Sequence, residues 1–184
     1  MTNVAGLWIN AAWGFAEGTL LFVVPDVAFT FTTLTSPKRG LQQLGAAILG
    51  AVVAGALMYV WADAQPAQAR AAVAAVPFVG ETIVAPAEER WDAGGTRSLF
   101  ANPLNGVPYK VYAVLAPGHL SLGTFLLLSL PLRAERMLIS WIVFAGASRW
   151  VRRLDATRAC RAIRIFHAGF WALVYVVYWT ANWR

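Results

Sequence analysis

One uninterrupted apolar run sets the strongest limit on how this chain folds. Residues 41–62 contain no charged side chain over 22 positions, and about 20 apolar residues in a helix are enough to cross a bilayer. A soluble domain could bury one such helix, but 59% of the 184 residues are apolar and only 13% are charged. That excess of apolar residues needs lipid to cover it. We therefore expect an integral membrane protein in which this run is a transmembrane helix.

The same run carries small residues at every fourth position. They form two adjacent stripes, Ala46, Gly50 and Ala54 beside Ala47, Ala51 and Gly55. Small residues in such a stripe let the backbone of a neighbouring helix approach closely. We expect another helix to pack tightly along this face.

Two other apolar segments, 4–34 and 98–132, are too interrupted to be single straight helices. Glu17 and the Pro25-Asp26 pair interrupt the first, and the second contains Pro103, Pro108, Pro117 and Pro131. Proline breaks a helix, and in lipid an unwound backbone survives only where protein or a water-filled cavity satisfies its polar groups. We predict an all-α membrane protein with two broken or re-entrant helical hairpins. Their breaks, near Pro25, Pro103, Pro108 and Pro117, should face one interior cavity.

The remaining segments complete a single transmembrane domain over residues 1–184. Residues 63–97 hold five acids and three arginines and indicate an exterior connection, whose apolar part, 71–87, predicts an interfacial helix or a partial insertion. Residues 149–164 hold six arginines against one acid, which indicates a basic cytoplasmic segment. A last helix is expected over 165–183. The protein should lie in the cell (inner) membrane as a multi-pass protein, with the Lys38-Arg39 turn also on the cytoplasmic side.

Several function classes lack support in the sequence. A formal net charge of +6 could serve nucleic acid, but no soluble domain carries the basic residues, and orienting the membrane segments explains them. Cys160 is the single cysteine, so neither an intrachain disulfide nor a cysteine metal cluster is possible. Phosphate-cradling glycine loops, zinc-binding HExxH helices and GxSxG elbows do not occur. We expect no cofactor, no metal and no nucleic-acid partner.

Five ionisable residues fall inside or beside the broken segments, and their signs divide between the two halves. Glu17 and Asp26 lie in the first half, whereas Lys110, Arg133 and Arg136 lie in the second. A charge deep in a bilayer costs at least about 2.5 kcal/mol, so each needs a partner of opposite charge or a proton. The set is consistent with a central site for polar chemistry. Structural ion pairs, or arginines that reach the membrane surface, would explain it as well.

Three functions from different classes are compatible with this set. A secondary transporter or flippase would bind an anionic lipid headgroup or lipid phosphate at Lys110, Arg133 and Arg136 and couple its movement to protons at Glu17 and Asp26. A structural or assembly subunit would use the charges for packing. A lipid-modifying enzyme would need a catalytic motif that the sequence does not display. The transporter is our leading hypothesis, with membrane lipids and protons as partners and a homo-oligomer left open.

Short motifs in both halves resemble the DedA superfamily, also called the VTT-domain or SNARE-associated Golgi protein group, and its YqaA-like branch in particular. The resemblance covers residues 12–150 and is carried by Phe15-Ala16-Glu17, Val24-Pro25-Asp26-Val27, Pro37-Lys38-Arg39, Val107-Pro108-Tyr109-Lys110 and Ala116-Pro117-Gly118. Many members have an arginine near the second hairpin's proline, where this chain has Asn102-Pro103.

The resemblance implies a small helical bundle in which two re-entrant hairpins face each other. It also implies translocation of a polyprenyl phosphate or a phospholipid, with proton coupling. By position, Glu17 and Asp26 match the acidic hairpin residues of the superfamily. Lys110, Arg133 and Arg136 would supply the cationic side.

Overall fold

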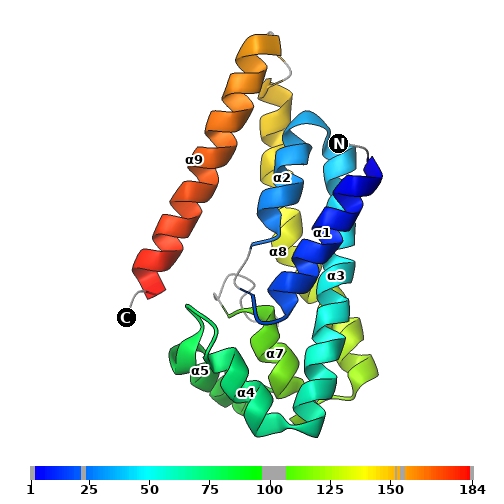
Figure 1. Ribbon diagram of the computed structural model, residues 1–184, viewed down its shortest axis with the longest axis vertical. Coiled ribbons are helices and arrows are strands. Elements are labelled where there is room, and N and C mark those ends of the chain that lie inside the picture. The colour runs from blue at the N-terminus through cyan, green and yellow to red at the C-terminus, as the bar shows by residue number, and fades with distance from the viewer. Residues whose placement is uncertain (1–2, 22–23, 97–106, 152, 154–155, 183–184) are drawn as a thin grey trace.

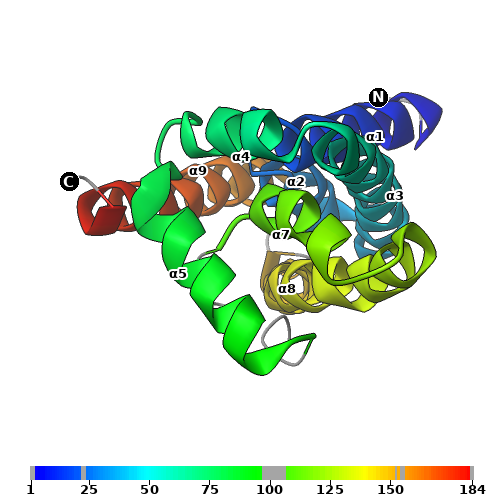
Figure 2. The same cartoon turned by 90° about the horizontal axis from the view of Figure 1, so that it is seen from below.

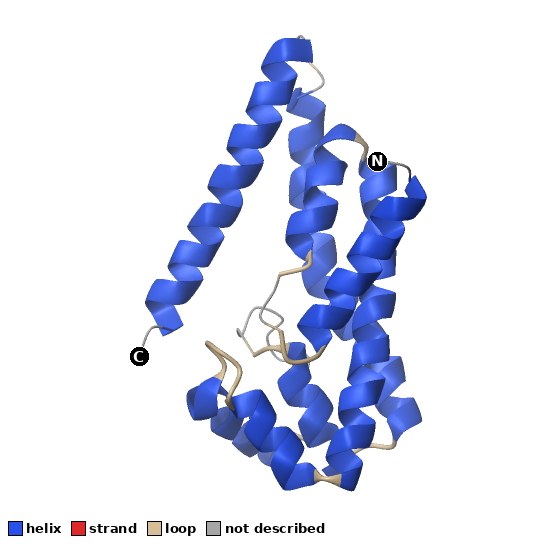
Figure 3. Ribbon diagram, viewed as in Figure 1, coloured by secondary structure: helices blue, strands red, loops and turns tan. Residues whose placement is uncertain are grey.

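A computed structural model describes residues 3–21, 24–96, 107–151, 153 and 156–182, and its regular structure over these residues is entirely helical (Figures 1 and 3). The predicted all-α class is therefore confirmed for the described part of the chain. In chain order the elements are α1 (Asn3–Gly18), α2 (Asp26–Thr35), α3 (Pro37–Ala64), α4 (Pro66–Ala74), α5 (Gly80–Gly94), α7 (Tyr109–Leu115), the 3₁₀ turn η1 (Ala116–Gly118), α8 (Leu122–Val151) and α9 (Ala156–Asn182).

Helix α3 contains the apolar run and extends beyond it at both ends. It has 28 residues, which corresponds to about 42 Å at 1.5 Å per residue. Proline at the first position suits a helix start because its missing N–H has no partner there in any case. Among the described helices, α3 is the one that is long and apolar enough to cross a membrane, judged by length and composition.

Helix α1 packs against the small-residue face of α3, as the stripes predict. A Cβ atom added to Gly50 would collide with the backbone carbonyl of Ala11 in α1, and one added to Gly14 would collide with the carbonyl of Ala47 in α3. The two backbones therefore approach closely at both points. The absence of side chains at these glycines is what permits the contact.

The first broken segment is two helices joined near the middle of the molecule. Helix α1 runs inward from one end and stops at Gly18, and α2 starts at Asp26 and returns toward the same end (Figure 1). Pro25 directly precedes α2 and is buried. The interruption at this proline places an acid at the end of one helix and another at the start of the next.

The second broken segment differs from its predicted boundaries. Helix α7 begins after Pro108 and has all seven of its residues buried, and Pro117 lies in the turn that follows it. Figure 2 shows α7 in the centre, surrounded by α3, α4, α5 and α8. Pro103 lies outside the described residues.

The predicted end of this segment at residue 132 is wrong, because α8 continues through Pro131 as one helix of 30 residues. Proline inside a helix costs about 3 kcal/mol, because one backbone hydrogen bond is lost and the ring clashes with the preceding turn. Phe125 and Met137 are fully buried on either side of Pro131. We attribute the continuity of the helix to this packing on both sides of the proline.

The basic segment 149–164 is not an extended loop. Helix α8 continues to Val151 and α9 begins at Ala156, nine residues before the predicted start of the last helix. Arginine is a good helix former, so a cluster of arginines does not by itself end a helix. The predicted connection 63–97 is likewise mostly helical, since α3 ends at Ala64 and both α4 and α5 follow.

The two basic regions lie at the same end of the molecule. The first turn of α3, which carries Lys38 and Arg39, lies at the end where α8 meets α9, whereas α4 and α5 lie at the opposite end (Figure 1). The arrangement matches the charge difference between the 149–164 and 63–97 segments.

Apolar side chains lie on the outside of the bundle as well as in its core, and several polar or charged side chains are buried. Large apolar residues are exposed along the outer helices, including Trp8 of α1, Leu49 and Val53 of α3, Leu127 and Ile142 of α8, and Leu173 of α9. Buried polar or charged residues include Asn10, Asp26, Gln43, Lys110 and Arg133. Acidic and basic side chains are rarely fully buried in soluble proteins.

Candidate functional site

The end of α1 is joined to the middle of α8 by an ion pair. Arg133 donates from Nη1 to Oε1 of Glu17 at 3.2 Å and from Nη2 to Oε2, so the contact is bidentate. The Arg133 side chain is 4% exposed and that of Glu17 is 12% exposed. A bidentate pair shielded from water fixes both position and orientation. The contact therefore connects the first half of the chain to the second at the break between α1 and α2.

A second ion pair joins the start of α2 to the same helix. Nη1 of Arg136 lies 3.2 Å from Oδ2 of Asp26. Asp26 is completely buried, whereas the Arg136 side chain is 34% exposed. The contact brings opposite charges together without hydrogen-bond geometry, and neither Asp26 carboxylate oxygen accepts a hydrogen bond from the described residues. Asp26 is thus a buried carboxylate whose charge is only partly compensated.

The two arginines reach both acids because they share one face of α8. Residues three apart in a helix lie about one turn apart on the same side. Arg133 meets the end of α1, and Arg136 meets the start of α2. One face of α8 therefore spans the break in the first hairpin.

Lys110 is the second residue of α7, and its ammonium group lies at the same break between α1 and α2. Its side chain is buried, with the residue 1% exposed, and Nζ donates to the carbonyl oxygen of Leu21 at 2.7 Å. Leu21 lies between α1 and α2, where the backbone has no helical partner. A lysine from the second half thus satisfies unwound backbone in the first half.

Tyr109 forms the aromatic wall beside the Glu17–Arg133 pair. The guanidinium carbon of Arg133 lies 5.1 Å from the centre of the Tyr109 ring, which is within cation–π range. The Tyr109 hydroxyl donates to Oγ of Ser129 at 2.7 Å, and Ser129 donates to the Phe125 carbonyl. Tyr109 appeared in the sequence only as part of a motif, and Ser129 carried no signal.

Helix α9 holds the first turns of α2 through hydrogen bonds that the sequence did not predict. Nε1 of Trp171 donates to Oγ1 of Thr30 at 3.1 Å, and Thr30 Oγ1 donates to the carbonyl oxygen of Asp26 at 2.6 Å. Nε2 of His167 lies 3.0 Å from the Val27 carbonyl. His167 therefore faces α2 from within α9. The hydrogen bonds connect α9 to the backbone of Asp26.

The structure assembles the predicted ionisable residues as two ion pairs and one lysine–carbonyl contact. Each acid has its own arginine, and Lys110 contacts backbone rather than a carboxylate. Pro25 and Pro108 directly precede α2 and α7, the helices that begin with Asp26 and Tyr109. The described residues contain no group of three His, Cys, Asp or Glu side chains arranged to hold a metal ion.

His119, which follows the 3₁₀ turn η1, contacts α5. It is 3.3 Å from Asp92 and stacks on Trp91 of α5. Nearby in the same connection, Arg70 of α4 forms ion pairs with Glu81 and Glu88 of α5. The pKa of Arg70 is raised, mainly by its hydrogen bonds to Glu81, whereas burial acts to lower it. These contacts hold α4 and α5 together.

Comparison of the chain with family models, curated proteins and solved structures finds no match. The resemblance to the DedA superfamily therefore rests on the short motifs alone.

Proposed function

We propose that the chain is a multi-pass membrane transporter that moves an anionic lipid or polyprenyl phosphate between leaflets, coupled to protons. One observation carries the proposal: buried charges of opposite sign from the two halves meet at the break in the first hairpin, within a helical bundle whose outer faces are apolar. Intramembrane ionisable groups are costly, and their usual use is in substrate or proton pathways. The two broken segments would be re-entrant hairpins.

The coupling follows from competition for the arginines. In the resting arrangement Glu17 neutralises Arg133, and Asp26 lies against Arg136. A proton bound by either carboxylate removes its negative charge and leaves its arginine free to bind a phosphate oxygen. Conversely, a phosphate on the arginine favours protonation of the displaced acid, because linkage acts equally in both directions. Proton binding and substrate binding become one linked event.

Lys110 would contribute to the same event from the other hairpin. Its ammonium group is held at 2.7 Å by a neutral carbonyl rather than by an acid. Among the described residues, no acid pairs with this ammonium group and would have to be displaced. A phosphate bound at Arg133 would therefore contact a second cation once Lys110 gives up its hydrogen bond to the Leu21 carbonyl.

The test is leaflet exchange of labelled lipid phosphates in liposomes that contain the purified protein, measured as a function of pH. Glu17→Gln or Asp26→Asn should abolish the pH dependence, and Arg133→Ala or Arg136→Ala should weaken substrate binding. Glu135→Gln is the matched control, since this acid is exposed on the same helix as the arginines. A well-folded Glu17 and Asp26 double variant with unchanged pH dependence refutes proton coupling.

A structural or assembly subunit is the second candidate, and one observation favours it. Each acid already lies against an arginine without any ligand, as expected of groups that only hold helices together. In that case the wild-type protein exchanges no lipid. Amide substitutions would then change the stability of the chain or its assembly with partners.

A further inference from the structure

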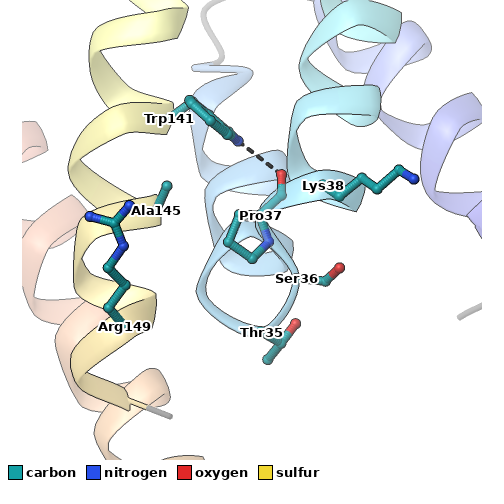
Figure 4. A pocket seen from close by; sticks show the side chains of 7 residues that line it. All are labelled: Thr35, Ser36, Pro37, Lys38, Trp141, Ala145 and Arg149. Carbon is teal, nitrogen blue, oxygen red and sulfur yellow. Dashed lines mark hydrogen bonds between the residues drawn. The ribbon is translucent and has the colours of Figure 1, made fainter.

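A pocket of about 470 Å³ opens at the basic end of the molecule, between the α2–α3 turn and the last turns of α8. It is lined by Thr35, Ser36, Pro37, Lys38, Trp141, Ala145 and Arg149 (Figure 4). Nε1 of Trp141 donates to the carbonyl oxygen of Pro37 at 3.0 Å. This hydrogen bond joins the two walls, so the pocket is a built feature of the packing between α8 and the turn.

The lining of the pocket is suited to an anion. Figure 4 shows Arg149 on α8 at one side of the pocket, and Lys38 and Ser36 on the far side of Pro37, where both side chains extend away from Arg149. None of the seven lining residues is acidic. Ser36 precedes α3 but makes no capping hydrogen bond through its side chain, so its hydroxyl is not used by the helix. Two cations and a hydroxyl group are the donors that phosphate oxygens require.

The pocket is separate from the ion pairs at the hairpin break. Arg149 follows Arg133 by 16 residues in the same continuous helix, which corresponds to about 24 Å. The surface around Arg149 also differs from the outer face of α8 nearer the ion pairs. That face is apolar and includes Ile142, whereas the surface at the basic end carries Arg39 and Arg153. A boundary between an apolar face and exposed cations is the level at which lipid headgroups lie.

We propose that this pocket binds the phosphate of an anionic membrane lipid, with the acyl chains along the apolar outer faces of α3 and α8. The inference rests on the membrane location given in the proposed function, but not on transport. Arg149 contacts the phosphate from α8, and the exposed Lys38 side chain and the Ser36 hydroxyl turn toward it from the α2–α3 turn, while the Trp141–Pro37 hydrogen bond keeps the walls together.

The test counts lipids bound to the purified full-length chain by native mass spectrometry, with phosphatidylglycerol as the probe and phosphatidylcholine as the neutral lipid. Replacing both pocket cations, Lys38→Gln with Arg149→Gln, should weaken phosphatidylglycerol binding by roughly 10- to 30-fold. Arg161→Gln with Arg164→Gln is the matched control, because both arginines are exposed on α9 and the same net charge is removed. The control should change binding by less than about twofold.

Each outcome decides the assignment. Equal losses in the two double variants, or no loss in the pocket variant, overturn the site. Inorganic phosphate is the second probe: if it binds through the same two cations and phosphatidylglycerol does not displace it, the site belongs to a soluble anion and the lipid assignment is wrong. Leaflet exchange without selective lipid binding refutes the pocket alone, whereas lipid binding without leaflet exchange refutes transport alone.

Discussion

Removing either partner of the Glu17–Arg133 pair should destabilise the fold far more than removing both. The two side chains are 12% and 4% exposed, so a single substitution leaves a charge inside the bundle without compensation. Breaking a buried pair in this way costs about 3–5 kcal/mol, whereas replacing both members by apolar residues of similar volume is often neutral or stabilising. We therefore expect large losses for Glu17→Leu and for Arg133→Met, and recovery of most of that loss in the double variant.

The assay is the free energy of unfolding in detergent micelles, followed by circular dichroism for the wild type, both single variants and the double variant. The coupling energy of this double-mutant cycle should be about 3 kcal/mol or more, because the loss in each single variant comes mainly from a buried charge left without its partner. If the double variant loses the sum of the two single losses, the side chains do not interact energetically. The ion pair would then explain neither the fold nor the proposed coupling.

Four further outcomes are expected. Gly50→Ala should destabilise the protein by about 1–3 kcal/mol in the same unfolding assay, because its Cβ would collide with the α1 backbone. Gly45→Ala, which meets nothing within 4 Å, should instead stabilise it by about 0.5–1 kcal/mol. Trp171→Phe should cost about 0.5–1.5 kcal/mol through the lost donor to Thr30, read as a lower unfolding midpoint. Cys160 should resist an impermeant thiol reagent added outside intact cells, and labelling there would reverse the assigned orientation.

Features determined by local chemistry could be predicted from the sequence. The charge-free run 41–62 lies within α3, since length and composition are enough to define such a helix. The small residues of that run indicated a close helix neighbour, and Gly50 meets α1. Pro25 marked the interruption in the first apolar segment because its effect on a helix is local.

Features that depend on packing could not be predicted. Pro131 carried the same breaking signal as Pro25, yet α8 continues through it with buried residues on both sides. The contact of α9 with α2 had no signal at all, because nothing in the spacing of Thr30, His167 and Trp171 relates positions about 140 residues apart. The signs of the buried charges indicated that partners were needed, but only the geometry of α8 decides that Arg133 meets Glu17 and Arg136 meets Asp26.

The contacts around the hairpin break connect three helices to one region of backbone. Arg136 approaches the Asp26 side chain from α8, Trp171 reaches its carbonyl through Thr30 from α9, and Lys110 of α7 holds the Leu21 carbonyl. A change in the charge of Asp26 therefore weakens the contact with α8 but leaves the backbone contacts with α7 and α9 intact. The contacts with α7 and α9 do not depend on that charge, so they would hold the break in place if the contact with α8 were lost. The proposed proton coupling would require such a local response within a fixed frame.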